Sequence, residues 1–108
     1  MDKKSFERYA ARARILKAMA HPARLCMVDA LSGGERCVCE LTALVGMDTS
    51  TVSKHLSVLK SAGIVSDEKR GLNVYYTLRM PCVMKFFGCV DTVISELVRE
   101  QMEWVLHE

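Results

Sequence analysis

The sequence predicts a mainly α-helical domain that carries one β-hairpin, in the order α-α-α-α-β-β-α. Two observations support this fold class. Apolar residues recur at helical spacing in four segments before residue 63 and in one long segment after Pro81. Between Ile64 and Leu78 the spacing changes to two residues, which is typical of β-strands. The 108 residues, 50% of them hydrophobic, suit one compact domain.

The first two helices are predicted over residues 5–20 and from Pro22 onward. In the first helix, basic residues separate apolar side chains that share one face: Phe6, Tyr9, Ala13, Leu16 and Met19. Proline suits the first position of a helix, so Pro22 marks the start of the second one. The pair Gly33-Gly34 ends it.

A short helix over about residues 39–45 is followed by a longer helix that ends before Gly63. Gly46 stops the short helix. Asp48 or Thr49 can cap the start of the longer helix, because both side chains accept a hydrogen bond from a free amide of the first turn. The longer helix has one apolar stripe, formed by Val52, Leu56 and Leu59.

The hairpin is predicted from the segments IVSDEK and NVYYTL, which the residues RGLN join. Gly71 can adopt the positive φ that a tight hairpin turn requires. Tyr75 and Tyr76 point to opposite faces of their strand, so one of them should pack against the helices. After Pro81 a final helix should run to about Leu106, with an apolar stripe made of Val83, Phe87, Val90, Ile94, Leu97, Val98 and Val105.

Charge is distributed unevenly along the chain. The net charge of +2 combines +6 over residues 1–90 with −4 over residues 91–108, so the first part can face a polyanion.

No segment approaches the roughly 20 apolar residues of a membrane span. The charged N-terminal segment does not resemble a secretory signal, so we expect a cytoplasmic protein with no membrane partner. Five cysteines, an odd number, do not suit a disulfide scaffold there, which leaves metal binding, redox sensing or burial.

The third and fourth helices form a helix-turn-helix candidate. Opposite its apolar stripe the fourth helix presents Thr51, Lys54, His55 and Val58, and Ser50 lies at its N-terminus. Hydroxyls and a cation on the free face of an anchored helix suit contacts with base edges and phosphates. Lys69 and Arg70 follow at the hairpin tip, where cations of a wing can reach DNA beside the helix. The sequence therefore predicts a winged helix-turn-helix that binds DNA.

The segments HPARL, CVCEL, STVSKHLSVLKSAGIV and RGLNVYYTL together resemble the ArsR/SmtB family of metal-responsive transcriptional repressors. The resemblance covers nearly the whole chain, as one domain over residues 1–108. It implies a homodimer built on residues 1–20 and 81–107, a helix-turn-helix over 39–62 and a wing over 64–78. Repression of a twofold-related operator and release by an inducer are also implied. Family DNA contacts fall on Ser50, Thr51, Ser53, Lys54 and His55 of the helix and on Lys69 and Arg70 of the wing.

Cys37 and Cys39 are the first candidate metal ligands. On a regular helix their side chains would point roughly 200° apart, so they can share one ion only where the backbone is extended or the first turn distorted. Thiolates favour thiophilic ions, whereas burial as small hydrophobic residues is the alternative. The CVCEL segment is similar to the box of arsenic/antimony-responsive and cadmium/lead-responsive members. The resemblance implies As(III) or Sb(III) as inducer, alternatively Cd(II), Pb(II) or Zn(II), and no organic cofactor.

The chain departs from the arsenic-type box at Thr42, where such boxes often have a third cysteine. Cys82 and Cys89, two helical turns apart, can complete the Cys37/Cys39 site, form a thiol site of their own, or only pack at the dimer seam. The cadmium-type members draw further cysteines from an N-terminal extension, and here none precedes Cys26.

Several residues are expected to have other roles. Cys26 lies in an apolar helical run and should belong to the core, and His21 should cap or pack. The zinc-type site of the last helix needs Asp and His pairs, but Asp91 is followed by no histidine before His107.

Two other functions compete with metalloid sensing. In a thiol redox or persulfide sensor of the same fold, the cysteine of the second helix would align with Asp29 and not with Cys26, which counts against it. A thiol enzyme needs a base beside its nucleophile, and no histidine has such a partner nearby in sequence, so no enzyme is expected.

Overall fold

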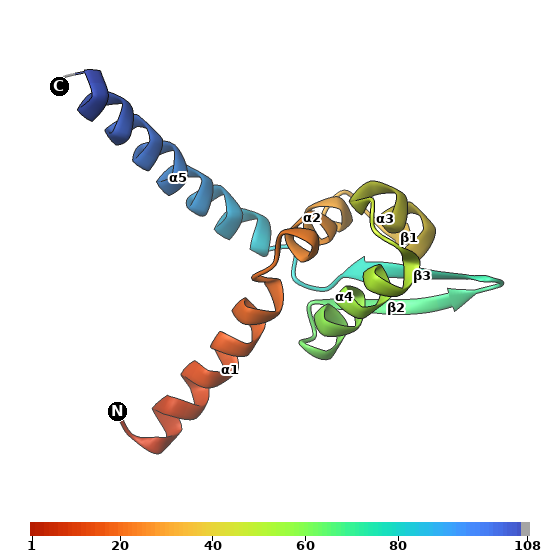
Figure 1. The fold of residues 1–108 in the computed structure, drawn as a ribbon. Helices are drawn as coiled ribbons and strands as arrows, with labels where there is room; N and C mark the ends of the chain where they lie inside the picture. The colour runs from red at the N-terminus through yellow and green to blue at the C-terminus, as the bar shows by residue number, and fades with distance from the viewer. Residues whose placement is uncertain (107–108) are drawn as a thin grey trace.

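The computed structural model describes residues 1–106 and confirms the predicted fold class (Figure 1). The elements, in chain order, are α1 (Lys3–Met19), α2 (Pro22–Leu31), β1 (Arg36–Cys37), α3 (Val38–Val45), α4 (Thr49–Ser61), β2 (Val65–Arg70), β3 (Asn73–Leu78) and α5 (Val83–Leu106). Helices α2, α3 and α4 and the small sheet form a central body. Helices α1 and α5 diverge from one side of it, and the hairpin extends from the opposite side.

The helix boundaries follow the local signals of the sequence. Asp48 is the N-cap of α4, and its carboxylate accepts a hydrogen bond from the Thr51 amide at 2.7 Å. His21 caps α2 in the same manner, since its Nδ1 accepts from the Ala23 amide at 3.0 Å. Gly46 ends α3 with φ 73°, a left-handed conformation in which a side chain would be strained. The capping role expected for His21 is thus confirmed.

The sheet has three strands in the order β1-β3-β2, one more than the sequence predicted. Strands β2 and β3 form the expected hairpin, with Val65 opposite Leu78 at its base and Arg70 opposite Asn73 at its tip. The additional strand β1 has two residues and pairs antiparallel with β3, Cys37 opposite Tyr75. Two residues are too few to show a strand periodicity, so this pairing was not visible in the sequence.

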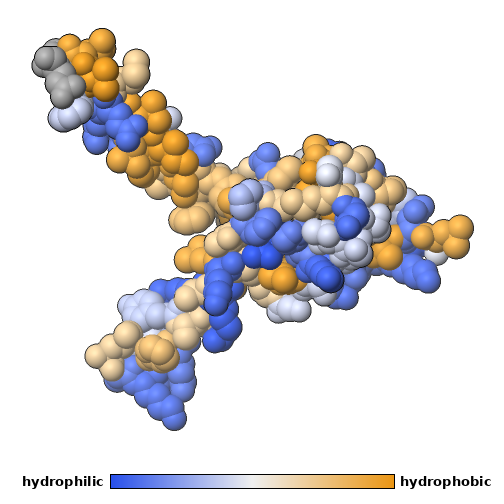
Figure 2. Space-filling model, viewed as in Figure 1, coloured by the Kyte–Doolittle hydropathy of each residue, from blue (hydrophilic) through white to orange (hydrophobic). Residues whose placement is uncertain are grey.

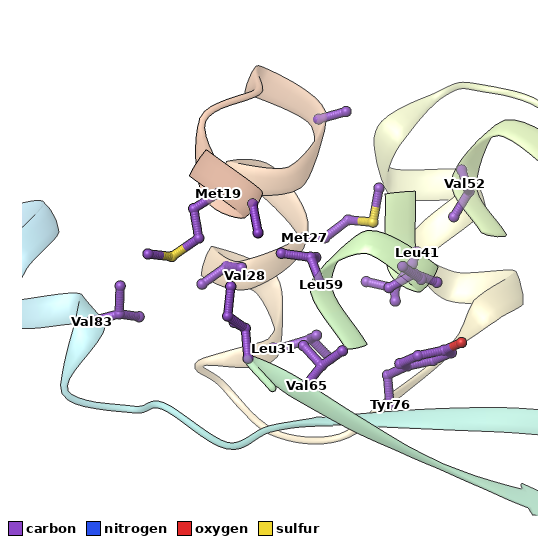
Figure 3. Close-up of a cluster of buried hydrophobic side chains, with 14 residues drawn as sticks. Met19, Met27, Val28, Leu31, Leu41, Val52, Leu59, Val65, Tyr76 and Val83 are labelled. Carbon is purple, nitrogen blue, oxygen red and sulfur yellow. The ribbon is translucent and has the colours of Figure 1, made fainter. Parts of the chain in front are cut away.

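The core lies between α2, α3, α4 and the base of the sheet (Figure 3). Its fully buried side chains are Met27, Val28, Leu41, Val52, Leu56, Leu59, Ile64, Val65 and Val83. The predicted stripe of α4 is therefore buried in full. Tyr76 faces the helices and is buried, whereas its neighbour Tyr75 is half-buried, as their alternation predicted.

Helices α1 and α5 leave much of their apolar surface uncovered. Val83 is the buried residue of α5 and Phe87 is half-buried against the core. The rest of the stripe is exposed: Val90, Ile94, Leu97, Val98 and Val105. On α1, Phe6, Tyr9 and Leu16 are about half exposed. Figure 2 shows hydrophobic residues along α5, away from the central body. Among residues 1–106, no helix combines the length and the apolar character needed to cross a membrane.

Candidate nucleic-acid interface and thiol site

Helix α4 presents a polar face opposite its buried stripe. Ser53 and Lys54 are exposed and Thr51 is half-buried. The Ser50 hydroxyl lies 3.3 Å from the Asp48 carboxylate, which also accepts the Thr51 amide. The hydrogen bonds from Thr51 lower the pKa of Asp48, so this carboxyl stays ionised. Lys54 is the cation of this face, and it forms no ion pair among the described residues.

His55 is turned toward α2 and is half-buried. Its Nδ1 lies 3.2 Å from an Arg24 nitrogen, and its ring centroid lies 4.4 Å from that of His21. Because a guanidinium only donates, Nδ1 must accept, which places the imidazole proton on Nε2. Burial, followed by the charges of His21 and Arg24, lowers the pKa of His55 and favours the neutral ring. His55, one of the residues of α4 predicted to contact DNA, thus also connects α4 to Arg24 of α2.

The two cations of the wing differ in their partners. Lys69 is exposed and forms no ion pair within residues 1–106. Arg70 is paired with Glu35, lies 3.6 Å from the Glu68 carboxylate and stacks over the Tyr75 ring at 4.4 Å. The hydrogen bond to Glu35 raises the pKa of Arg70. Sequence reasoning missed this attachment because Glu35 is 35 positions away.

Cys37 and Cys39 are brought together at the start of α3. Cys37 is the last residue of β1 and the N-cap of α3, with an extended backbone (φ −77°, ψ 160°). Their Cα atoms are 5.3 Å apart, and a disulfide joins the two side chains. The extended conformation that a shared site requires is therefore present. Cys37 is buried, with 5% of its surface exposed, whereas Cys39 is exposed.

A capping box built on sulfur fixes this position. The Glu40 amide donates to Cys37 Sγ at 3.3 Å, and the Cys37 amide donates to Glu40 Oε1 at 3.3 Å. Arg36 lies 3.7 Å from the same Glu40 carboxylate. The pattern Cys-x-x-Glu is that of a Ser-x-x-Glu capping box with sulfur in place of oxygen, so the sequence carried a signal for it.

The thiol pair lies between the two predicted DNA-contacting elements. Through β1, Cys37 pairs with Tyr75 of β3, which leads to the wing tip. Through α3, it is followed by Leu41, which is fully buried in the same cluster as Val52 and Leu56 of α4. A displacement at Cys37 can therefore reach both the wing and α4.

The remaining cysteines lie apart from this pair. Cys82 and Cys89 are exposed, on or just before α5, which leaves the body on the side opposite α3 (Figure 1). Within residues 1–106 of one chain, no three His, Cys, Asp or Glu side chains converge as metal ligands. The Thr42 hydroxyl donates to the Val38 carbonyl at 2.7 Å. His107 lies outside the described residues.

Cys26 is half-buried rather than part of the fully buried core. It lines an open groove of about 800 Å³ between α1, α2 and α5. Asp29 and Asp91 line the same groove, together with apolar side chains such as Phe87.

Comparison with known proteins identifies the family. Residues 21–67 match the family model described as "Bacterial regulatory protein, arsR family". The nodulation protein NolR of Rhizobium meliloti is 33% identical over 84 residues, which cover 78% of this chain and 69% of that protein. The chain belongs to the arsR family of bacterial regulatory proteins. The matched part of this arsR-family chain comprises helices α2, α3 and α4, strand β1 and the start of β2.

Two further curated relatives are similar over part of their length. The arsenic resistance transcriptional regulator ArsR1 of Pseudomonas putida is 39% identical over 72 residues, 67% of this chain and 53% of that protein. The HTH-type transcriptional regulator Rv0324 of Mycobacterium tuberculosis is 37% identical over 84 residues, 78% of this chain. This arsR-family chain spans 37% of the length of Rv0324.

Solved structures of relatives share the fold over most of the chain. The crystal structure of NolR from Sinorhizobium fredii has a TM-score of 0.77 at 32% identity and covers 86% of this chain and 93% of that one. The homodimeric winged helix-turn-helix DNA-binding domain of Mb0332 from Mycobacterium bovis has a TM-score of 0.77 at 31% identity and covers 93% of both chains. The winged helix-turn-helix architecture is therefore that of this family.

Proposed function

We propose that this protein is a homodimeric, DNA-binding transcriptional repressor that a thiophilic metalloid, As(III) or Sb(III), releases from its operator. One observation supports this most strongly. The sulfur atoms of Cys37 and Cys39 meet at the N-terminus of α3, and α3 packs against the helix that carries the predicted DNA contacts.

The DNA-binding part of the proposal rests on α4 and the wing. Exposed Ser53 and Lys54 and half-buried Thr51 occupy the free face of an anchored helix, which suits major-groove contacts. Lys69 supplies a cation at the wing that no described carboxylate neutralises. We assign contacts to Ser50 and to Arg70 as well, although the Ser50 hydroxyl and the Arg70 guanidinium already have protein partners.

The dimer would be formed by residues 1–20 and 81–107. The exposed apolar stripes of α1 and α5 are more than an isolated soluble domain usually leaves uncovered, and burying them would stabilise an assembly. The Mb0332 domain, similar over 93% of this chain, is homodimeric. A twofold dimer places two α4 helices on successive major grooves of a palindromic operator.

The inducer site would be built on Cys37 and Cys39. The Cys37–Cys39 disulfide must first be reduced, with a cellular thiol as the two-electron reductant. The two thiolates that result suit As(III), Sb(III), Cd(II) or Pb(II) better than hard cations do. A trigonal arsenic site takes a third sulfur, which in this proposal comes from Cys82 or Cys89 of the partner subunit, or from a small thiol in solution. If Cys82 and Cys89 do not contribute, these two cysteines form a thiol site of their own or only pack at the dimer seam.

The effector must discriminate between the free and DNA-bound states. Shifting a two-state population from 99:1 to 1:99 requires a difference in affinity of about 10⁴, or about 5.5 kcal/mol. Binding at Cys37 would contribute to this difference by displacing the cap of α3 and the β1 strand together, since both depend on that residue.

Fluorescence anisotropy of a labelled duplex, selected from a random pool by the wild-type protein, tests the proposal. We expect arsenite and antimonite to lower DNA affinity at least tenfold for wild type. Cys37→Ser and Cys39→Ser should bind DNA normally and ignore arsenite. Lys54→Ala should weaken DNA binding and leave arsenite affinity unchanged, whereas Lys85→Ala, an exposed lysine of α5, is the matched control. Unchanged anisotropy of wild type with arsenite and antimonite would exclude these metalloids as inducers.

A thiol redox or persulfide sensor is the second candidate, and one observation favours it. Cys37 and Cys39 form a disulfide in this structure. Oxidation would remove two protons and two electrons from the thiol pair, with peroxide or a polysulfide as the oxidant. In the same assay, release by polysulfide that dithiothreitol reverses, with no effect of arsenite, would identify this sensor. Release by Cd(II) or Pb(II) alone would indicate a metal sensor.

A further inference from the structure

Leu72 occupies an unusual place at the tip of the wing. Arg70 pairs with Asn73, so Gly71 and Leu72 form a two-residue loop. Gly71 has φ 61°, and among the described residues only glycines have a positive φ, as in a type II′ turn with glycine first. The Leu72 side chain is 100% exposed, more than any other large hydrophobic side chain of the described residues.

Neither the core nor the proposed dimer covers Leu72. The core lies at the base of the sheet, whereas the tip is the outermost point of the hairpin (Figure 1). Most of the other exposed large hydrophobic side chains lie on α1 and α5, on the opposite side of the body. Figure 2 shows hydrophobic atoms at the end of the wing with hydrophilic ones beside them. Leu72 is therefore left for a different partner.

The charges around the tip suit an anionic partner. The acidic residues of β2 are already paired, Asp67 with Lys60 at 2.9 Å and Glu68 with Arg70 at 3.6 Å. Lys69 has no such partner within residues 1–106. The single charge of Arg70 is shared between Glu68 and Glu35, so the unpaired cation beside the exposed leucine is Lys69.

We infer that Leu72 is a wedge that enters the minor groove of the operator and partly separates two stacked base pairs, while Lys69 binds the adjacent phosphate. Apolar side chains inserted between base steps kink DNA in this way. This inference rests on the proposed DNA-binding function and adds to it a mechanical effect on the operator: bending at two sites, one for each wing of the dimer.

The reach of the hairpin fits this placement. Six residues of strand at about 3.3 Å each give the hairpin a length of roughly 20 Å from its buried base at Val65 to its tip. Major and minor grooves alternate along one face of DNA by half of a turn of about 34 Å, which is roughly 17 Å. With α4 in a major groove, the hairpin is therefore long enough to reach the neighbouring minor groove.

A measurement of DNA bending distinguishes the insertion of Leu72 between base pairs from electrostatic attraction alone. A duplex selected from a random pool by the wild-type protein, carrying a fluorophore at each end, reports its end-to-end distance by energy transfer. We compare wild type with Leu72→Asn, which suits a turn and removes the apolar tip, and with Leu72→Met, which keeps it. Lys69→Ala removes the cation alone. Leu72 contacts no core residue, so the thermal midpoint should be equal in all four proteins.

We expect wild type and Leu72→Met to bend the duplex by a similar angle, within about 20–90° per wedge, and Leu72→Asn to leave it nearly straight. Its affinity should fall less than about tenfold, because the burial of the leucine and the unstacking of bases oppose each other. Lys69→Ala should retain bending and reduce the salt dependence by about one phosphate contact per wing. Equal bending by Leu72→Asn and wild type, or a straight duplex with wild type, would overturn the wedge while DNA binding stands. Failure to select any duplex would overturn the proposed function itself.

Discussion

Replacing Cys37 separates its role as a helix cap from its role as a thiol. Cys37 Sγ accepts the Glu40 amide at 3.3 Å and is the N-cap of α3. Serine restores an acceptor at this position, whereas alanine does not. Loss of a side-chain N-cap costs about 1 kcal/mol, within about 0.5–2 kcal/mol. Since both variants lack the thiol and the disulfide, the difference between Cys37→Ala and Cys37→Ser isolates the cap.

Urea unfolding followed by circular dichroism, at one protein concentration and with reductant present, measures this difference. We expect Cys37→Ser to be more stable than Cys37→Ala by about 1 kcal/mol, which is about 4–8 °C in the thermal midpoint of a domain of this size. Both variants should lose the response to arsenite.

The neighbouring cysteine provides the control. Cys39 is exposed and caps nothing, so Cys39→Ala and Cys39→Ser should agree within about 0.5 kcal/mol. Equal stabilities for the two Cys37 variants would refute the stabilising role of the cap. An Ala–Ser difference at Cys39 as large as the one at Cys37 would refute it as well.

Three further outcomes are expected. Thr42→Cys places a thiol one turn after Cys39 and should tighten arsenite binding at least tenfold in a calorimetric titration; no gain would mean that the third sulfur has another source. Leu56→Ala, in the fully buried stripe of α4, should lower the free energy of unfolding by about 2–5 kcal/mol, and a loss below 1 kcal/mol in urea unfolding would contradict its core position. Burial and the charges of His21 and Arg24 lower the pKa of His55, so the unfolded chain binds more protons than the folded one below the ordinary value of 6.5. The contribution of His55 to the free energy of unfolding is therefore fully present above pH 6.5 and is lost as the pH falls through its lowered pKa. His55→Gln should flatten this decrease in a series of urea unfolding curves at different pH. Identical pH profiles for the two proteins would exclude His55 as its cause.

Elements with local signals were predictable from the sequence. Helix α4 is defined by its cap at Asp48, its stripe and the stop at Gly63, all within one short segment. The hairpin is defined in the same way by its period of two and by Gly71. Each of these signals acts between residues near one another in the chain, so no knowledge of the tertiary structure was required.

Features that depend on distant residues were not predictable. The attachment of Arg70 to Glu35 joins positions 35 apart, and that of His55 to Arg24 joins positions 31 apart. Helical periodicity places His55 on the face opposite the stripe, but it does not show that α2 passes beside that residue. The assignment of Cys26 to the core failed for a similar reason, because α5 leaves an open groove beside it.

Strand β1 adds a second route by which the proposed inducer site at Cys37 and Cys39 would affect DNA binding. From the sequence, Cys37 and Cys39 could pull only on α3 and, through it, on α4. In the structure Cys37 also pairs with Tyr75 of β3, which runs directly to the wing tip at Leu72. An ion that takes Cys37 Sγ withdraws it from the Glu40 amide and shifts the end of β1. Because a packed core responds by switching arrangement rather than by gradual deformation, one small movement at this residue would displace the wing together with α4, the helix proposed to enter the major groove.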